Sequence, residues 1–259
     1  MKLTLMYFSP THTTKKIVSA VGKVFFEKLL CETAVADITP LAARMRDYTF
    51  GEEDILVFGA PVYGGRVASP AAEVLRGLHG NGARAVVVCL YGNRDYDDAL
   101  LESRDLLEQS GFRVCAAAAF IGEHSYSGKV GARRPDTEDL LAAASFGIVA
   151  FEKVASGEPI AKKIKGAYPY KEFSAFMLAP KAAPETDAGK CTRCGACISL
   201  CPVCNIGADL SDGGRCIACA ACVKFCPAGA RRFAEEGILS ARKRLEENCT
   251  VRRQPEFYI

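Results

Sequence analysis

The stretch CTRCGACISLCP, which runs from Cys191 to Pro202, is repeated as CIACAACVKFCP, from Cys216 to Pro227. Each copy follows the pattern C-x-x-C-x-x-C-x-x-x-C-P. The chain contains 13 cysteines, and most of them lie in the segment that holds the two copies. Cysteines this dense and this closely spaced indicate metal binding rather than disulfide bonds in a protein of a reducing compartment.

The repeat has the spacing of bacterial ferredoxins that carry two iron–sulfur clusters. A zinc site would need only two C-x-x-C pairs and would have no use for the remaining cysteines or the proline. Three cysteines at intervals of three can hold one face of a [4Fe–4S] cluster, and the fourth, carried away by the longer gap, ligates the other cluster. The sequence therefore predicts two ligand sets, which are Cys191, Cys194, Cys197 with Cys226, and Cys216, Cys219, Cys222 with Cys201.

Cys204 falls outside this pattern, because Gly229 occupies the matching position of the second copy. We expect Cys204 to be a packed bystander near a cluster. The cysteines outside the repeat are predicted to be core or spare thiols, and they are Cys31, Cys89, Cys115 and Cys249.

Residues 1–155 alternate apolar runs with amphipathic stretches. Buried strands are predicted at 3–8, 33–38, 54–60, 83–91 and 114–121, and helices at 12–30, 69–80, 96–110 and 136–155. Continuous apolar strands that alternate with helices are typical of an α/β doubly wound parallel sheet, here five-stranded, with helices on both faces.

The rest of the chain divides on composition. We expect a linker at 156–185, a small α+β domain with both cysteine motifs at 186–235, and a C-terminal helix and tail at 236–259. The charged stretch EEGILSARKRLEEN is predicted to form the helix of this last part.

Three loops of the predicted sheet point to a ligand. SPTHTT (9–14) opens the first helix, where hydroxyls, free amides and the helix dipole favour a phosphate. A threonine-rich N-cap would use the same residues. The loops at 60–67 and 91–100 also leave carboxyl ends of strands, where ligands bind in open α/β sheets. Each of them offers an aromatic residue and glycines that could enclose a flat ring.

Together the loops resemble those of the flavodoxin family. Residues 9–14 match its phosphate loop, [ST]-x-T-G-N-T, at the hydroxyls, with His12 in place of glycine and Thr13 in place of asparagine. GNRDY (92–96) matches G-D-x-x-Y, with Asn93 in place of aspartate.

The whole chain resembles the fused flavodoxin–ferredoxin proteins of anaerobes. That resemblance implies FMN and two [4Fe–4S] clusters as cofactors, with Tyr63 and Tyr96 covering the faces of the flavin. The FMN-binding residues that it implies are Ser9, Thr11, His12, Thr13, Thr14, Pro61, Val62, Tyr63, Gly64, Tyr91, Gly92, Asn93 and Tyr96.

Composition excludes some other classes of protein. The formal net charge of +3 is too small to indicate nucleic acid or an anionic membrane as a partner. No apolar run approaches the ~20 residues that a membrane helix needs, and MKLTLMYF is too short for a signal sequence. We therefore expect a cytoplasmic protein without a membrane span.

No Ser/His/Asp set or pair of carboxylates suggests hydrolysis, so no catalytic residue is predicted. His124, in the glycine-flanked stretch GEHSYSG, is expected on the flavin side of the sheet, either touching the ring or serving the fold. One predicted function is electron transfer between FMN, the clusters and a protein partner in anaerobic metabolism. The alternative is an FMN-dependent reductase of a small molecule, fed by the clusters, which would need a polar pocket beside the flavin.

We expect about eight iron and eight sulfide per chain after anaerobic purification, because the doubled motif supplies ligands for two clusters. Cys201→Ser should lose about half of the iron or more, whereas Cys204→Ser should keep it. Iron and acid-labile sulfide assays measure both. Zinc without sulfide, or equal losses from the two variants, would contradict the ligand assignment.

Overall fold

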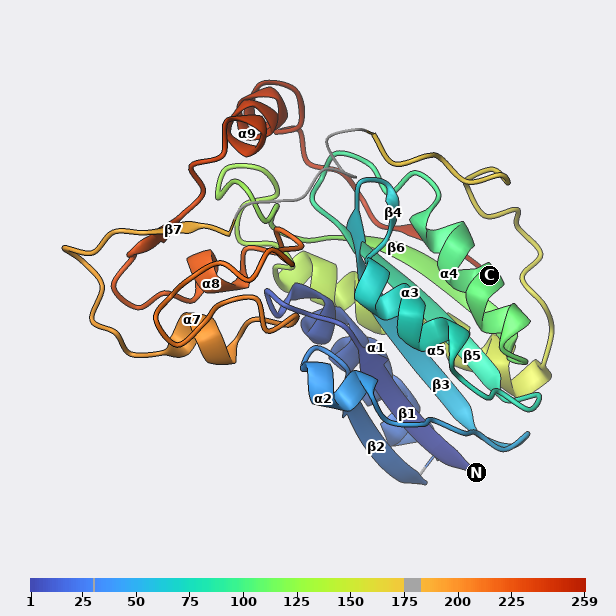
Figure 1. Cartoon of the computed structure of the whole chain (residues 1–259). Coiled ribbons are helices and arrows are strands. Elements are labelled where there is room, and N and C mark those ends of the chain that lie inside the picture. The colour runs from blue at the N-terminus through green and yellow to red at the C-terminus, as the bar shows by residue number, and fades with distance from the viewer. Residues whose placement is uncertain (30, 175–182) are drawn as a thin grey trace.

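Five parallel strands form the central sheet of the larger domain (Figure 1). The computed structural model describes residues 1–29, 31–174 and 183–259. The strands are β1 (Lys2–Tyr7), β2 (Glu32–Asp37), β3 (Ile55–Tyr63), β5 (Arg84–Tyr91) and β6 (Arg113–Ile121). Their spatial order is β2-β1-β3-β5-β6, which is the order of the flavodoxin-like doubly wound fold. The predicted five-stranded parallel sheet is therefore confirmed.

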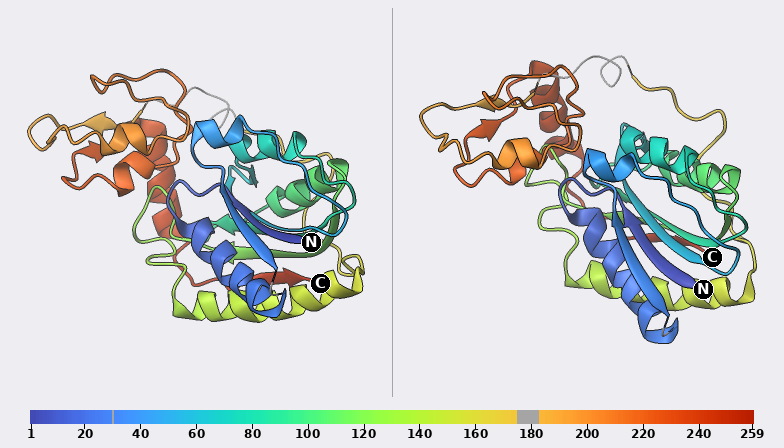
Figure 2. Two further views of the ribbon diagram at one scale, coloured as in Figure 1. Left: turned by 90° about the horizontal axis from the view of Figure 1, so that it is seen from below. Right: turned by 60° about the horizontal axis from the view of Figure 1, so that its bottom comes forward.

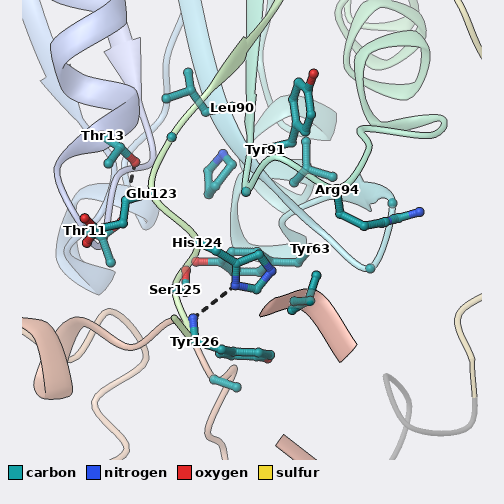
Figure 3. Close-up of a pocket in the computed structure, with 18 of the residues that line it drawn as sticks. Thr11, Thr13, Tyr63, Leu90, Tyr91, Arg94, Glu123, His124, Ser125 and Tyr126 are labelled. Carbon is teal, nitrogen blue, oxygen red and sulfur yellow. Dashed lines mark hydrogen bonds between the residues drawn. The ribbon is translucent and has the colours of Figure 1, made fainter. Parts of the chain in front are cut away.

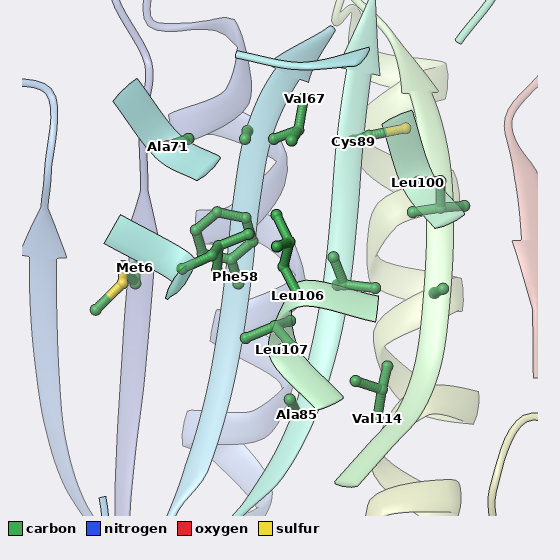
Figure 4. Close-up of a cluster of buried hydrophobic side chains, with 14 of the residues drawn as sticks. Met6, Phe58, Val67, Ala71, Ala85, Cys89, Leu100, Leu106, Leu107 and Val114 are labelled. Atoms are coloured by element: carbon green, nitrogen blue, oxygen red, sulfur yellow. The ribbon is translucent and has the colours of Figure 1, made fainter. Parts of the chain in front are cut away.

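Helices cover both faces of this sheet (Figure 2). α1 (Thr13–Leu29) and α5 (Thr137–Ser156) pack on one face, and α3 (Ser69–Arg76) and α4 (Ala99–Gln109) on the other. Successive residues of β3 alternate between the two cores, since Val57 joins the α1 and α5 side while Phe58 joins the α3 and α4 side. Figure 4 shows Phe58 with Met6 and Leu107 in the second of these cores.

Two short elements were not predicted. α2 (Leu41–Arg44) follows β2, and β4 (Arg66–Val67) folds back against the end of β3. The reversal between β3 and β4 passes through Gly64 and Gly65, both with positive φ, a conformation that glycine adopts without steric cost. This turn brings the second loop back over the carboxyl edge of the sheet.

The cysteine segment folds as two similar halves. α7 (Ala196–Ser199) and α8 (Ala221–Lys224) occupy equivalent places in the two sequence copies. Each helix follows a residue in the left-handed region, Gly195 in the first copy and Ala220 in the second. β7 (Glu185–Thr186) pairs antiparallel with β8 (Arg231–Arg232) and joins the ends of this small domain.

The tail after the small domain returns to the larger sheet. α9 (Glu236–Asn248) forms where a helix was predicted, and then β9 (Glu256–Tyr258) pairs antiparallel with β6. This strand, which lies at the edge of the sheet, was not predicted. It is stabilised by residues far away in the sequence, because Phe257 packs against Phe120 and Phe146, with ring centroids 5.6 and 5.1 Å away.

Part of the predicted linker packs on the larger domain. The backbone amides of Ala167 and Lys171 donate to the Asp98 carboxylate at 2.9 and 2.6 Å, and the Tyr170 hydroxyl donates to Asp105 at 2.6 Å. Residues 175–182 of the linker lie outside the described residues. Of the helices that the structure describes, none has the length and apolar character to cross a membrane.

The ion pair of Arg134 and Asp139 should matter far more to stability than an exposed pair. Both side chains are almost fully buried, at 3% and 1% exposure, and Arg134 also donates to the carbonyl of Arg253 in the tail at 2.7 Å. Arg134→Met leaves the buried Asp139 carboxylate with only the Asp136 amide at 3.0 Å and the more distant Arg252 at 3.8 Å, and should lower the free energy of unfolding by about 3 kcal/mol. The control Lys153→Met breaks a pair whose partner Glu158 is exposed and should cost at most about 1 kcal/mol. Denaturant titrations followed by circular dichroism measure the free energy of unfolding. An equal decrease in both variants would contradict this ranking.

Candidate cofactor sites

A cavity of about 200 Å³ lies at the carboxyl ends of the central strands (Figure 3). The first loop lies beside α1, and the rings of Tyr63, His124 and Tyr126 lie toward the small domain. The predicted residues that line the cavity are Thr11, Thr13, Pro61, Val62, Tyr63, Gly64, Tyr91 and Gly92. The predicted residues that do not line it are Ser9, His12, Thr14, Asn93 and Tyr96.

The first loop has the donors that a phosphate needs. The hydroxyl of Ser9 accepts from the amide of Lys15 at 3.0 Å and so fixes the turn into α1. Thr11 and Thr13 face the cavity. The hydroxyl of Thr14 is buried and has no hydrogen-bond partner among the described residues. Thr14 itself does not line the cavity. The two hydroxyls that do, at a helix N-terminus, fit a bound phosphate group.

His12 has a different position from the one predicted. Its φ of 63° is in the left-handed region, where the family motif has glycine and where histidine is one of the tolerated residues. The ring lies outside the cavity and packs on Phe225 of the second cysteine motif, with centroids 4.6 Å apart. His12 therefore joins the phosphate loop to the small domain and does not face a phosphate in the cavity.

The second loop closes tightly against the third. A Cβ atom on Gly65 would lie 2.3 Å from the Oδ2 atom of Asp97, so only glycine allows this approach. Tyr63 stands between the cavity and the cysteines. Burial raises the pKa of its hydroxyl well above the ordinary value, and the neighbouring Cys219 and Cys216 add to the rise.

The third loop binds the tail. The amide nitrogen of Asn93 donates to the carbonyls of Cys249 and Val251 at 2.6 and 2.8 Å. Tyr96 was predicted to cover the flavin, but it is 1% exposed and its hydroxyl bonds to Glu256 and Tyr258 at 2.6 and 2.7 Å. Both motif residues thus bond to the C-terminal tail, and neither lines the cavity.

A fourth loop, residues 122–126, completes the cavity wall. The Nδ1 atom of His124 accepts from the amide of Tyr126 at 3.1 Å, which leaves the proton of the neutral ring on Nε2. Burial lowers the pKa of His124 to about 4, so the ring is neutral near pH 7. A Cβ atom on Gly92 would lie 2.4 Å from this ring. The glycine-flanked stretch was the only sequence signal for the loop.

The cysteines gather around two smaller cavities. Cys191, Cys194, Cys197 and Cys226 line one of them, and Cys201, Cys216, Cys219 and Cys222 line the other. This is the grouping that the spacing predicts. Cys204 was predicted to be packed, and that prediction is wrong, because Cys204 is exposed and lines neither of the two cavities.

The chemistry of each cysteine set fits an iron–sulfur cluster. Four cysteines line each cavity, and backbone amides donate to some of their sulfurs, as Asn205 does to Cys201 at 3.2 Å and Ala230 does to Cys226 at 3.2 Å. Amide donors of this kind stabilise the charge on cluster sulfurs. In the part of the chain that the structure describes, no three His, Cys, Asp or Glu side chains are placed to hold a single metal ion.

The large cavity and the second cysteine cavity share a wall. Ile217 and Ala218, which lie between Cys216 and Cys219, line both. The larger domain also contacts the cysteine segment and α9 directly. Arg44 donates to the carbonyl of Pro202 at 2.5 Å, Lys224 pairs with Glu123 at 2.8 Å, and Ser127 donates to Glu246 at 2.8 Å.

Comparisons with known proteins identify part of the chain. Residues 184–203 match the 4Fe-4S binding domain family, and no curated protein matches the chain. An archaeal flavodoxin structure is 17% identical, with a TM-score of 0.43, over 60% of this chain and 99% of that one. Oxidised flavodoxin 1 from Bacillus cereus is 16% identical, with a TM-score of 0.43, over 59% of this chain and 98% of that one. Rubredoxin oxygen:oxidoreductase from the anaerobe Desulfovibrio gigas is 13% identical, with a TM-score of 0.44, over 60% of this chain and 36% of that one.

The chain thus joins a flavodoxin-like domain, defined by its strand order, to a ferredoxin-type 4Fe-4S region. The matched residues cover the first cysteine motif. The second motif, from Cys216 to Cys226, lies beyond the match.

Asn93→Asp should loosen the tail. The aspartate would place a carboxylate against two carbonyl oxygens that now accept hydrogen bonds, and buried acceptors left unpaired cost about 1–3 kcal/mol. The same loop offers a control, Asp95→Asn, which breaks a half-exposed pair with Lys165 and should cost at most about 1 kcal/mol. We expect faster tryptic cleavage at Arg252 and Arg253 in the first variant alone, and equal cleavage of both would contradict the assigned role of Asn93.

Proposed function

We propose that the chain is an electron-transfer protein that holds FMN in the large cavity and a [4Fe–4S] cluster on each cysteine set. The observation that carries the proposal is the shared wall. Because Ile217 and Ala218 line both the large cavity and the second cysteine cavity, a flavin and a cluster in these places would be separated by little more than two residues.

The case for FMN rests on the first loop and on the cavity. The cavity-facing hydroxyls of Thr11 and Thr13, at the N-terminus of α1, suit the single phosphate of FMN. The sequence has no Gly-x-Gly-x-x-Gly turn at this helix, which a pyrophosphate such as that of FAD would favour. Tyr63 and Tyr91, with the glycines beside them, would enclose the flat ring. Bound FMN would supply a centre that exchanges two electrons together or one at a time.

The case for two clusters rests on the repeat. The first copy lies in the matched family segment, and the second copy has the same spacing and surrounds an equivalent cavity. Each cluster would carry one electron at a time, so the flavin would convert between two-electron and one-electron transfer.

The burial of the cysteines suggests an order of transfer. Cys219 and Cys222 of the second set are buried, whereas Cys194 of the first set is exposed. We infer that electrons pass between the flavin and the second cluster, then to the first cluster, and from there to a separate redox protein in the cytoplasm.

The alternative is an FMN-dependent reductase of a small molecule. Charged and polar groups, among them Arg94, Glu123 and His124, line the same cavity, as a substrate site would need. The wall that the small domain and Leu245 contribute to the cavity favours electron transfer, since it occupies the side from which a substrate could approach the flavin.

FMN should bind more tightly than FAD, and Thr11→Ala should weaken FMN. Removing a hydrogen bond to a charged group costs ~1.5–3 kcal/mol, which is on the order of tenfold to a hundredfold in dissociation constant. Calorimetric titration of flavin-free protein measures these constants, with Thr33→Ala on β2 as the control that leaves the loop intact. Tighter binding of FAD, or an unchanged dissociation constant of FMN in Thr11→Ala, would mean that the loop only caps the helix.

Electron transfer between clusters and flavin should occur within one chain. After rapid mixing with a one-electron reductant, the rate of flavin bleaching should not depend on protein concentration. The rate should vanish in a Cys191→Ser/Cys216→Ser variant that still binds FMN, and Cys204→Ser serves as the control that keeps it. A rate proportional to protein concentration would mean transfer between chains.

A further inference from the structure

Arg231 is a buried cation with unused donors. It begins β8, is 4% exposed, and donates from Nη1 to the hydroxyl of Thr186 at 2.5 Å. Its Nε and Nη2 atoms have no hydrogen-bond partner in the described part of the chain. Burying a charge without compensation is costly, so this guanidinium calls for a negative partner.

The acidic side chain that the Arg231 charge acts on, Asp212, is already engaged with other donors. The Asp212 carboxylate is close enough for the Arg231 cation to help lower its pKa. Its two oxygens, however, accept from the amides of Ala183 and Gly214 and from the side chain of Asn205, at 2.8, 2.9 and 2.8 Å. The free donors of Arg231 therefore remain for another acceptor.

The cysteines surround the guanidinium. Arg231 lines the cavity of the first cysteine set. It also lies near the second set, because β8, which Arg231 begins, packs against α8, which carries Cys222. The cation thus lies between the two sites that would hold clusters.

The repeat itself does not require a cation here. Arg231 stands five positions after the last cysteine of the second motif, and Ile206 stands at the same place in the first. Ile206 is buried and lines the second cysteine cavity. An apolar residue therefore meets the packing needs of this position, and the arginine adds a charge that packing does not explain.

We propose that Arg231 is the shared counter-cation of the two clusters and raises their reduction potentials. The proposal rests on the proposed function, since it requires both clusters. Each cluster becomes one unit more negative when it takes an electron from a donor. A buried cation stabilises that added charge, and its free N–H groups can donate to cluster sulfurs. Net charge and hydrogen bonds to sulfur are among the factors that set iron–sulfur potentials.

The test compares Arg231→Gln with Arg231→Lys and with the control Arg232→Gln in the full chain, loaded anaerobically with iron and sulfide. Arg232 is the next residue of β8, but it is exposed and pairs with Glu185. Dye-mediated redox titration followed by electron paramagnetic resonance gives the potential of each cluster. We expect Arg231→Gln to disfavour reduction by at least about tenfold, a shift of ~59 mV for a one-electron couple. Arg231→Lys should shift less, and Arg232→Gln should not shift.

The outcomes separate this inference from the proposed function. Unchanged potentials in an Arg231→Gln protein with full iron content would overturn the inference alone. If that variant loses iron, Arg231→Lys decides at full iron content, because the smaller shift expected there supports the inference and unchanged potentials overturn it. Loss of iron from both variants would make Arg231 a structural residue and overturn the inference. A wild-type protein without acid-labile sulfide would instead overturn the proposed function.

Discussion

The pairing of β9 with β6 is the constraint on which the rest of the molecule depends. The chain is anchored to the larger domain before the cysteine segment, at Asp98, and again after it, at this edge of the sheet. A domain fastened on both sides has less conformational freedom than one on a single flexible connection. This restriction keeps Ile217 and Ala218 at the cavity, where Lys224 and Phe225 add direct contacts to the phosphate-loop side.

The same constraint explains why two flavodoxin-like motif residues have new partners. Asn93 donates to backbone carbonyls of the tail and Tyr96 bonds to Glu256 and Tyr258. An aspartate in place of Asn93 could not donate to those carbonyls, so the departure from the family motif has a physical reason. The departure at His12 has one as well, because the histidine keeps the backbone conformation of glycine and gains a ring contact with Phe225.

The parallel strands, the main helices and the grouping of the eight cysteines were predictable from the sequence, because each depends on local pattern or on spacing. The remainder depends on contacts between distant residues. β9 is too short for a hydrophobic pattern and is stable only against β6, Phe120 and Phe146. The match to the family motif predicted Tyr96 beside a flavin. That prediction was wrong because a local motif carries no information about Glu256, which lies 160 residues later in the chain and bonds to Tyr96. That His124, Ile217 and Ala218 line the cavity could not be predicted, because it depends on how the two domains pack together.

The position of β9 along the chain also bears on how the protein matures. During synthesis, N-terminal segments can fold before later ones emerge. The loops of the large cavity are made first, the cysteine segment next, and the strand that fastens them last. Until β9 emerges, the edge of β6 is unpaired and the small domain lacks its second anchor. For the proposed function, this open stage of the nascent chain is the one in which a flavin and clusters would be inserted, and the pairing of β9 ends it.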